Sequence, residues 1–390
     1  MCGHRSYRRD QWGIRFIKVL VLVLLFLPGC AYQTTRFPWR TCSSSTVPLF
    51  QSTGNGGWLG SDDAMSIVLP TGKTLWLYGD TWIGSASGVN RAGSQFASNS
   101  IGISNCPAGS WGGLPGQNFF WQRLPNGRRK GYFYDPFTTG FWWWPVEGFV
   151  YQNALYIFAD RVVTPRGGGF QQVSTDLLTG TNLNPNQPLG DDPTLWHWSA
   201  PQTVIRGESP LMGSSINNDG TYLYMVGFND DWSAVLTRCL LANLDNIAAS
   251  LEYYSQDGTW HLGFDTSDAQ RLFSPGAPEM SIRYHPSNST WYAFYTYPFP
   301  PAQGVNIYER TAPALTGPWS PPTSVYVIPE TDSGSDHYNP TYIAYAGKEH
   351  IEWATNSSTV VTYAVNSTDF FTLVEDMTIY YPIPVVIPLP

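Results

Sequence analysis

Short apolar strands separated by tight turns recur along this chain, and each repeat begins near a carboxylate or a small polar residue. The clearest repeat begins at Asp62 and has the turn 70–73 between an apolar strand and an aromatic-rich strand. Looser repeats follow at intervals of roughly 65–85 residues and begin near Glu147, Gly213, Glu279 and Glu349. The pattern predicts an all-β fold, a five-bladed β-propeller, with six blades as the alternative because 106–140 is irregular.

Helical periodicity is nearly absent, and only 234–249 predicts a short helix. No low-complexity linker interrupts the chain after the first 54 residues. We therefore expect an extended lead-in over 31–54 and one propeller domain over 55–385. The first residue of each inner strand should point into a shared pocket on the axis, because inner strands converge there.

The first 30 residues read as an export signal. Basic residues precede the apolar run 19–27, which is too short to span a bilayer comfortably. Leu27-Pro28-Gly29-Cys30 resembles a bacterial lipobox, in which Cys30 would be lipidated and tether the protein to a membrane. The alternative is an ordinary signal peptide, or a short uncleaved anchor, with an incidental cysteine. Both alternatives predict an extracellular or cell-surface protein.

Sequons and cysteines leave further alternatives open. Three Asn-X-Ser/Thr sequons make the chain a glycoprotein candidate, although a Ser/Thr/Asn-rich chain produces such triplets by chance; they begin at Asn288, Asn356 and Asn366. Cys42 and Cys106 form a disulfide in an oxidising compartment, or they and Cys239 are buried thiols.

Composition narrows the class of partner. Lys and Arg total 21 against 29 Asp and Glu, which disfavours nucleic acid because phosphate binding needs a basic face. The 17 Trp and 23 Tyr favour a polysaccharide or oligosaccharide, since the apolar faces of sugar rings stack on aromatic side chains. No Cys/His pattern suggests zinc, and 229–231 is a polar loop more readily than a Ca²⁺ site. We expect a monomer without metal or cofactor.

Several phrases together carry a resemblance to a known family. They are 60–63 followed by 75–81, Trp143-Trp144-Pro145-Val146-Glu147-Gly148, the Ala-Pro-Ala-Leu-Thr-Gly-Pro-Trp phrase at 312–319, and 345–350. In this order they resemble a bacterial family of secreted five-bladed propellers, formerly of unknown function, that includes endo-D-arabinanases. The chain is more distantly similar to the five-bladed propeller glycoside hydrolases.

This resemblance covers residues 55–385 and is more specific for fold than for activity. It implies a glycoside hydrolase-like propeller. The chain departs from the family pattern at Glu147, where relatives often carry Asp, and at Asp63, where relatives often carry Gly.

Glycoside hydrolysis requires two carboxyl groups that face each other across the scissile bond, one protonated and one ionised. Asp62 opens the first inner strand and is the candidate base or nucleophile; the alternative is a turn-capping aspartate. Glu147, beside three tryptophans, and Glu279, in an apolar setting, are the candidate acids, because burial raises a carboxyl pKa.

Other residues are candidates for substrate binding or for structural roles. Alternation places Trp142 and Trp144 on one face of a strand and Trp143 on the other, so one set packs in the core and the other is free to bind sugar. His350 and Glu352, two apart, should face the same side and bind hydroxyls or form an inter-blade pair. Structural roles are expected for Asp63, Asp80 and the pair Asp160–Arg161.

Two functions of different classes remain. The first is an exported glycoside hydrolase acting on a neutral or furanose-rich polysaccharide through paired carboxylates at the axis. The second is a non-catalytic carbohydrate-binding or structural surface propeller.

Overall fold

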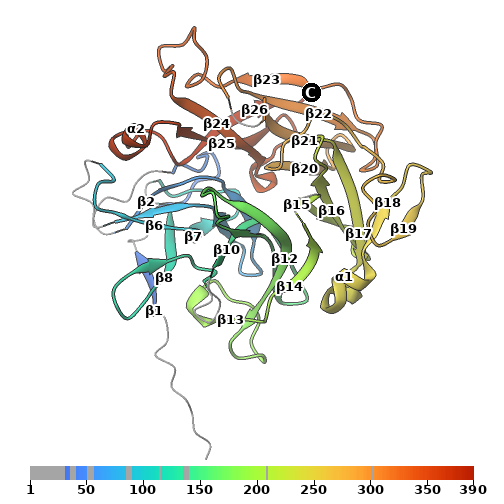
Figure 1. The fold of residues 1–390 in the computed structure, drawn as a ribbon, viewed down its shortest axis with the longest axis horizontal. Coiled ribbons are helices and arrows are strands. Elements are labelled where there is room, and N and C mark those ends of the chain that lie inside the picture. Colours follow the sequence, from blue (N-terminus) through green and yellow to red (C-terminus); the bar gives the residue numbers. More distant parts are fainter. Residues whose placement is uncertain are drawn as a thin grey trace, which may run out of the picture.

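The protein is described by a computed structural model in which antiparallel sheets are arranged around a central axis (Figure 1). The structure describes residues 31–35 (backbone only), 41–50, 57–84, 90–113, 116–134, 140–207, 210–299 and 302–390. The predicted export signal, 1–30, lies outside these ranges. None of the helices in the described ranges is long and apolar enough to cross a membrane.

Five sheets form the five blades, each built from one continuous stretch of the chain, apart from β1. Blade 1 contains β1 (Ala31–Thr35), β3 (Met65–Val68), β4 (Lys73–Tyr78), β7 (Ser100–Pro107), β8 (Gln117–Arg123) and β9 (Arg129–Lys130). Blade 2 contains β10 (Phe141–Tyr151), β11 (Ala154–Val163), β12 (Gln171–Asn182), β13 (Trp196–Trp198) and β14 (Gln202–Arg206). Blade 3 contains β15 (Leu211–Asn218), β16 (Tyr222–Phe228), β17 (Ala234–Leu240), β18 (Glu252–Tyr254) and β19 (Trp260–Leu262).

The last two blades are smaller. Blade 4 contains β20 (Met280–His285), β21 (Thr290–Tyr297), β22 (Asn306–Ala312) and β23 (Thr323–Val327). Blade 5 contains β24 (Tyr342–Glu349), β25 (Ser358–Ser367) and β26 (Pro382–Pro388). The prediction of a five-bladed propeller is confirmed, and the irregular stretch 106–140 contributes β8 and β9 to blade 1 rather than a sixth blade.

Short elements complete the fold. A small sheet is formed by β2 (Trp58–Ser61), β5 (Thr81–Ile83) and β6 (Gln95–Ala97). The helices are η1 (Pro193–Leu195), η2 (Leu241–Asn246), α1 (Ile247–Ser250), η3 (Ile351–Trp353) and α2 (Phe370–Glu375). The helix predicted within 234–249 is thus present as η2 and α1. The disulfide alternative holds for Cys42 and Cys106, whereas Cys239 is a buried thiol.

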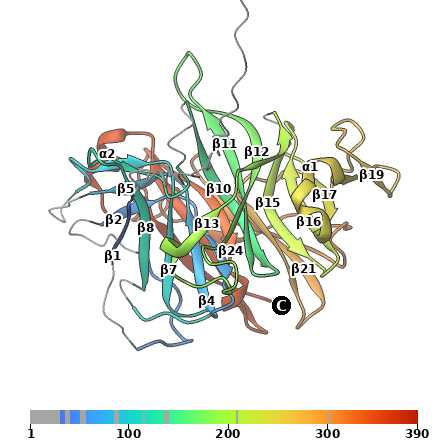
Figure 2. The ribbon, with the colours of Figure 1, turned by 90° about the horizontal axis from the view of Figure 1, so that it is seen from below.

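Apolar side chains pack between neighbouring blades. One cluster joins Leu75 of blade 1 to Trp143 of blade 2, and another joins Phe228 of blade 3 to Met280 of blade 4. Burial of these side chains is the main favourable contribution to folding, at roughly 25 cal/mol per Å² of apolar surface. In side view, the β11–β12 hairpin and α2 lie toward the same face of the disc (Figure 2).

The inner strands β3, β10, β15, β20 and β24 surround the axis. Three of them have register irregularities where they pair with the next strand, between Pro145 and Glu147, Met212 and Ser215, and Tyr345 and Lys348. Such bulges bend a strand and redirect its side chains, often beside functional sites. Glu147 lies in the middle of β10 and Glu349 at the end of β24, so the prediction that both residues begin inner strands was wrong.

The ring closes between blade 5 and blade 1 through buried side chains. Lys348 Nζ lies 3.1 Å from Asp63 Oδ1 and donates to the Val146 carbonyl at 2.9 Å, so one ammonium group joins three blades. Two residues further along the chain, His350 Nδ1 lies 2.8 Å from Ser66 Oγ. Lys348 has no exposed surface. A buried charge of this kind is tolerated only with its partners in place.

Replacement of Lys348 by methionine should therefore destabilise the fold. The change leaves the Asp63 carboxylate buried without its counter-ion, and breaking a buried pair in this way costs about 3–5 kcal/mol. We expect urea denaturation at pH 7 to show a loss of this size. The further change Asp63→Asn should restore part of it.

Lys73→Met is the matched control. Its ion pair with Asp191 spans 2.7 Å, but the two side chains are 27% and 31% exposed. A solvent-exposed pair contributes at most about 1 kcal/mol. Equal losses in the two variants would contradict the closing role of Lys348.

Candidate active site

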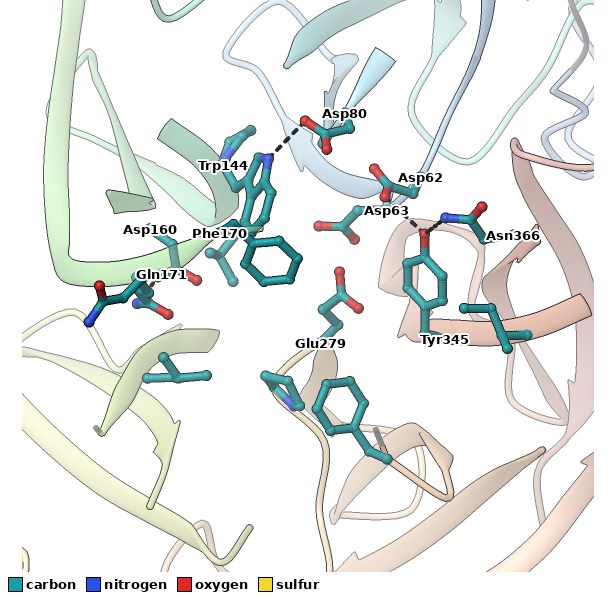
Figure 3. A pocket seen from close by; sticks show the side chains of 18 of the residues that line it. Asp62, Asp63, Asp80, Trp144, Asp160, Phe170, Gln171, Glu279, Tyr345 and Asn366 are labelled. Carbon is teal, nitrogen blue, oxygen red and sulfur yellow. Dashed lines mark hydrogen bonds between the residues drawn. The ribbon is translucent and has the colours of Figure 1, made fainter. Parts of the chain in front are cut away.

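A cavity of about 1100 Å³ opens at the axis and is lined by residues from all five blades. Six of its side chains carry carboxyl groups: Asp62, Asp63, Asp80, Asp160, Asp230 and Glu279. None of the described residues that line it is Lys, Arg or His. Figure 3 shows that Glu279 faces Asp62 and Asp63 across the cavity, with Asp160 to one side. The sequence-based expectation that carboxylates from different repeats meet at one centre fits this placement of Asp62 and Glu279.

The backbone beside Asp62 is held against the backbone of Asp80. The Asp62 amide donates to the Asp80 carbonyl at 3.3 Å, and the Gly79 amide donates to the Asp62 carbonyl at 3.1 Å. A Cβ atom at Gly79 would lie 2.6 Å from Asp62 Oδ1. Glycine at 79 therefore lets the Asp62 side chain lie flat against the neighbouring chain.

Two tyrosine hydroxyls hold the Asp62 carboxyl group. Tyr345 donates to Asp62 Oδ2 at 2.9 Å, and Tyr380 makes a second side-chain hydrogen bond. Burial raises the pKa of Asp62 to about 7, the two hydroxyls oppose that rise, and the charge of Asp63 adds to it. Hydrogen bonds to the charged form favour it, so the two hydroxyls limit the rise of the Asp62 pKa, whereas the pKa values of Asp80 and Glu279 are raised well above their ordinary values. The amide of Asn366, from one of the sequons, donates to the Tyr345 hydroxyl at 2.9 Å.

Glu279 precedes β20 and reaches the cavity from blade 4. Burial raises its pKa well above the ordinary value, and the nearby Asp63 carboxylate raises it further. Lys348 opposes this rise. Among the described residues, no side chain or backbone amide is hydrogen-bonded to the Glu279 carboxyl group. Glu279 is thus suited to be protonated and to donate that proton.

Two further carboxyl groups that line the cavity, Asp80 and Asp160, also have strongly raised pKa values. Trp144 donates its indole N–H to Asp80 at 2.9 Å, and burial with the charge of Asp62 raises the Asp80 pKa well above its ordinary value. Gln172 donates to Asp160 at 2.6 Å, while burial raises the Asp160 pKa to about 8. In the described part of the chain, no three His, Cys, Asp or Glu side chains are grouped to hold a metal ion.

Three residues predicted for the site lie outside the cavity lining. Glu147 is an ion-pair partner of Arg283 and accepts from the Ile216 amide at 3.0 Å, so its carboxylate is engaged in the closed part of the axis. We therefore remove Glu147 from the candidate acids.

His350 and Glu352 also lie away from the cavity. His350 is buried between Ser66 and Thr362, and its pKa is lowered to about 3 by burial and then by Arg283 and Lys348. Because β24 ends at Glu349 and η3 follows, strand alternation does not apply to these two residues. His350 instead forms the inter-blade hydrogen bond that was the alternative prediction for it.

Aromatic side chains surround the carboxyl groups. Trp143 is buried in the core and donates to Asp176, whereas Trp142 and Trp144 contact each other on the opposite face of β10, as alternation predicts. Trp144 lines the cavity and packs edge-on against Phe170, with ring centroids 4.8 Å apart. Phe170 is 67% exposed and lines the cavity beside Trp144.

From the sequence, Asp80 and Asp160 were expected to have only structural roles. The pairing of residues in their hairpins, however, indicates that both lie near the axis. Met65 pairs with Leu77, and continuing that register backwards brings position 80 opposite position 62. Trp144 pairs with Asp160 in the next blade. A register drawn from the turns would have placed both carboxyl groups at the axis. Tyr345 and Tyr380 carried no comparable signal, since their contacts with Asp62 join opposite ends of the chain.

Comparison with known proteins identifies relatives of the fold. The profile of a family described as "Domain of unknown function (DUF5005)" matches residues 49–381. No curated protein matches the chain. Among solved structures, a candidate hydrolase from Bacteroides ovatus has 16% identity and a TM-score of 0.61, over 85% of this chain and 86% of that chain. At this identity the likeness shows the fold alone.

Two enzymes are more distant. An exo-β-1,3-galactanase from Phanerochaete chrysosporium has 10% identity and a TM-score of 0.48, over 88% of this chain and 64% of that chain. An α-L-arabinofuranosidase from Podospora anserina has 10% identity and a TM-score of 0.45, over 88% of this chain and 95% of that chain.

The raised pKa values make stability depend on pH. Asp62 and Asp160 have ordinary values of 3.8 and are raised to about 7 and about 8. The folded protein therefore binds protons that the unfolded chain has released, and its free energy of unfolding should fall as pH rises from 4 to 8. Asp160→Asn should be more stable than the wild type at pH 8, by roughly 1–3 kcal/mol, and similar to it at pH 4. Urea denaturation across this range measures the difference.

Asp257→Asn is the control of opposite sign. Hydrogen bonds from Thr259 lower the pKa of Asp257 to about 2, so this variant should lose stability at neutral pH. A gain at pH 8 that is equal for both variants would contradict the pKa assignment of Asp160.

Proposed function

The chain belongs to the family described as a domain of unknown function, DUF5005, and from the geometry of its cavity we propose that it is a glycoside hydrolase of neutral glycans. One observation carries the proposal. Carboxyl groups from blades 1, 2, 3 and 4 converge in one open cavity whose other walls are largely aromatic. Glycoside hydrolases need such a pair of carboxyl groups with different protonation states.

The contacts of Asp62 and Glu279 suit each carboxyl group to a different role. Asp62 accepts hydrogen bonds from the Tyr345 and Tyr380 hydroxyls, which favour its anion. It acts as the base that takes a proton from attacking water, or as the nucleophile at the anomeric carbon. Glu279 keeps its proton because it is buried beside other carboxyl groups, and it gives that proton to the glycosidic oxygen as the bond to the leaving sugar breaks.

Asp80 is the second candidate for the proton donor. Its pKa is also raised well above the ordinary value, and its backbone lies against that of Asp62. Its carboxyl group accepts the Trp144 indole N–H, a contact that Glu279 lacks among the described residues. We therefore place Glu279 first and test Asp80 beside it.

The lining favours an uncharged substrate. No basic residue stands among the described lining residues, so uronic acids and phosphorylated sugars would lack a counter-ion there. Aromatic walls favour sugar rings, whose C–H faces stack on them. A neutral polysaccharide or oligosaccharide, of the arabinan, xylan or galactan type, fits both features.

We also propose that the protein acts outside the cytoplasm as a monomer. The export signal predicted at 1–30 supports this location. The Cys42–Cys106 disulfide supports it too, since disulfides persist mainly in oxidising compartments. Lipidation at Cys30 is one form of this proposal, and an ordinary cleaved signal peptide is the other.

Reducing-end release from arabinan, xylan and galactan tests the reaction. We expect one of these glycans to be hydrolysed, and Asp62→Asn and Glu279→Gln each to lower kcat by about 10²–10⁴. Asp80→Asn should have a smaller effect if Glu279 is the donor. Asp257→Asn, on an exposed hairpin, should leave the rate unchanged.

Two outcomes would contradict the proposal in different ways. Full activity in both Asp62→Asn and Glu279→Gln would remove the assigned roles. Binding of a glycan without any hydrolysis would favour the non-catalytic carbohydrate-binding propeller.

A further inference from the structure

The loop between β16 and β17 presents a buried amide to the cavity without a protein partner. Asn229 is 4% exposed and lines the cavity. Neither its Oδ1 nor its Nδ2 is hydrogen-bonded to any described residue. Its backbone, in contrast, is fully used: its amide donates to the Ser233 carbonyl at 3.0 Å, and its carbonyl accepts from the Trp232 amide at 2.9 Å. A buried, unpaired side-chain amide is rare and costs stability, so it requires an explanation.

The same loop holds a tryptophan in a costly backbone conformation. Trp232 has φ of 59°, a region that bulky side chains seldom adopt. Its indole packs edge-on against Phe299 of blade 4, with ring centroids 4.7 Å apart, and both rings line the cavity. Strain of this kind at a cavity wall indicates a functional constraint on the side chain.

This wall is connected to the segment that carries Glu279. The Gly276 amide donates to the Trp232 carbonyl at 2.9 Å, three positions before Glu279. Phe299 also packs on the apolar cluster that contains Ala277 and Met280, on either side of Glu279. The loop and the segment of the proposed proton donor are therefore in direct contact between blades 3 and 4.

We propose that Asn229, Trp232 and Phe299 form a binding subsite for a neutral sugar unit on the leaving-group side of the scissile bond. The inference rests on the proposed function, because it is Glu279 as proton donor that makes this side the leaving-group side. The aromatic pair contacts the C–H face of the ring. The Asn229 amide has two N–H donors and one carbonyl acceptor, which match vicinal hydroxyl groups. A ligand hydroxyl would supply the partners that the amide lacks in the protein.

Binding measurements in an inactive background test the subsite apart from the reaction. Isothermal titration calorimetry would use Asp62→Asn with arabino-, xylo- and galacto-oligosaccharides of two to six units. Adding Asn229→Ala or Trp232→Gly should each weaken the affinity for the bound oligosaccharide about tenfold. Trp232→Gly is the sharper variant, because glycine adopts positive φ without cost and the fold should retain its Tm.

Two matched controls separate the subsite from general surface effects. Asn218→Ala removes an exposed amide at the β15–β16 turn. Phe371→Ala removes a phenyl group that is 79% exposed, beside the cavity-lining Phe370 but outside the lining. Both controls should bind as Asp62→Asn does.

The outcomes distinguish this inference from the proposed reaction. Weaker binding in Asn229→Ala and Trp232→Gly supports the subsite even if the wild type hydrolyses none of the glycans. Unchanged affinity in both variants, or no binding by any oligosaccharide at millimolar concentration, overturns the subsite. Hydrolysis by the wild type would then still support the proposed reaction.

Discussion

The structure depends on one buried ion pair, between Lys348 of blade 5 and Asp63 of blade 1. Neighbouring blades elsewhere in the ring are consecutive along the chain, but these two come from opposite ends of the sequence. Their contact closes the ring and fixes the inner strands that carry the cavity residues. The same ammonium lies close enough to Asp160 and Glu279 to lower their pKa values against the effect of burial. Lys348 therefore contributes both to ring closure and to the charge of the site.

Several groups around the cavity lower the stability of the folded protein. Carboxyl groups that are buried near one another bind protons at pH values where exposed carboxyls are ionised, and they reduce stability as the pH rises. Natural proteins retain such groups where a reaction needs them. The unpaired amide of Asn229 and the left-handed backbone of Trp232 are costs of the same kind. All of them lie around one cavity, which is why we assign them to ligand binding and chemistry.

The sequence predicted the architecture well because its signals were local. Hairpin turns and alternating apolar residues fix a strand and its faces, as Trp143 and Trp144 show. The position of a side chain along the propeller axis was not predictable in the same way. Glu147 was expected at a strand head, yet β10 begins six residues earlier and carries it into the closed part of the axis. Contacts between distant segments, such as Tyr345 with Asp62, leave no local pattern.

Titration of the side-chain carboxyl carbons by ¹³C NMR tests the central claim most directly, because it needs no substrate. Resonances are assigned by comparison with the Asp62→Asn and Asp160→Asn variants. We predict that Asp62 titrates near pH 7 and Asp160 near pH 8. Titration of both groups near pH 4, as in exposed carboxyls, would show that the cavity does not hold protons and would contradict the account.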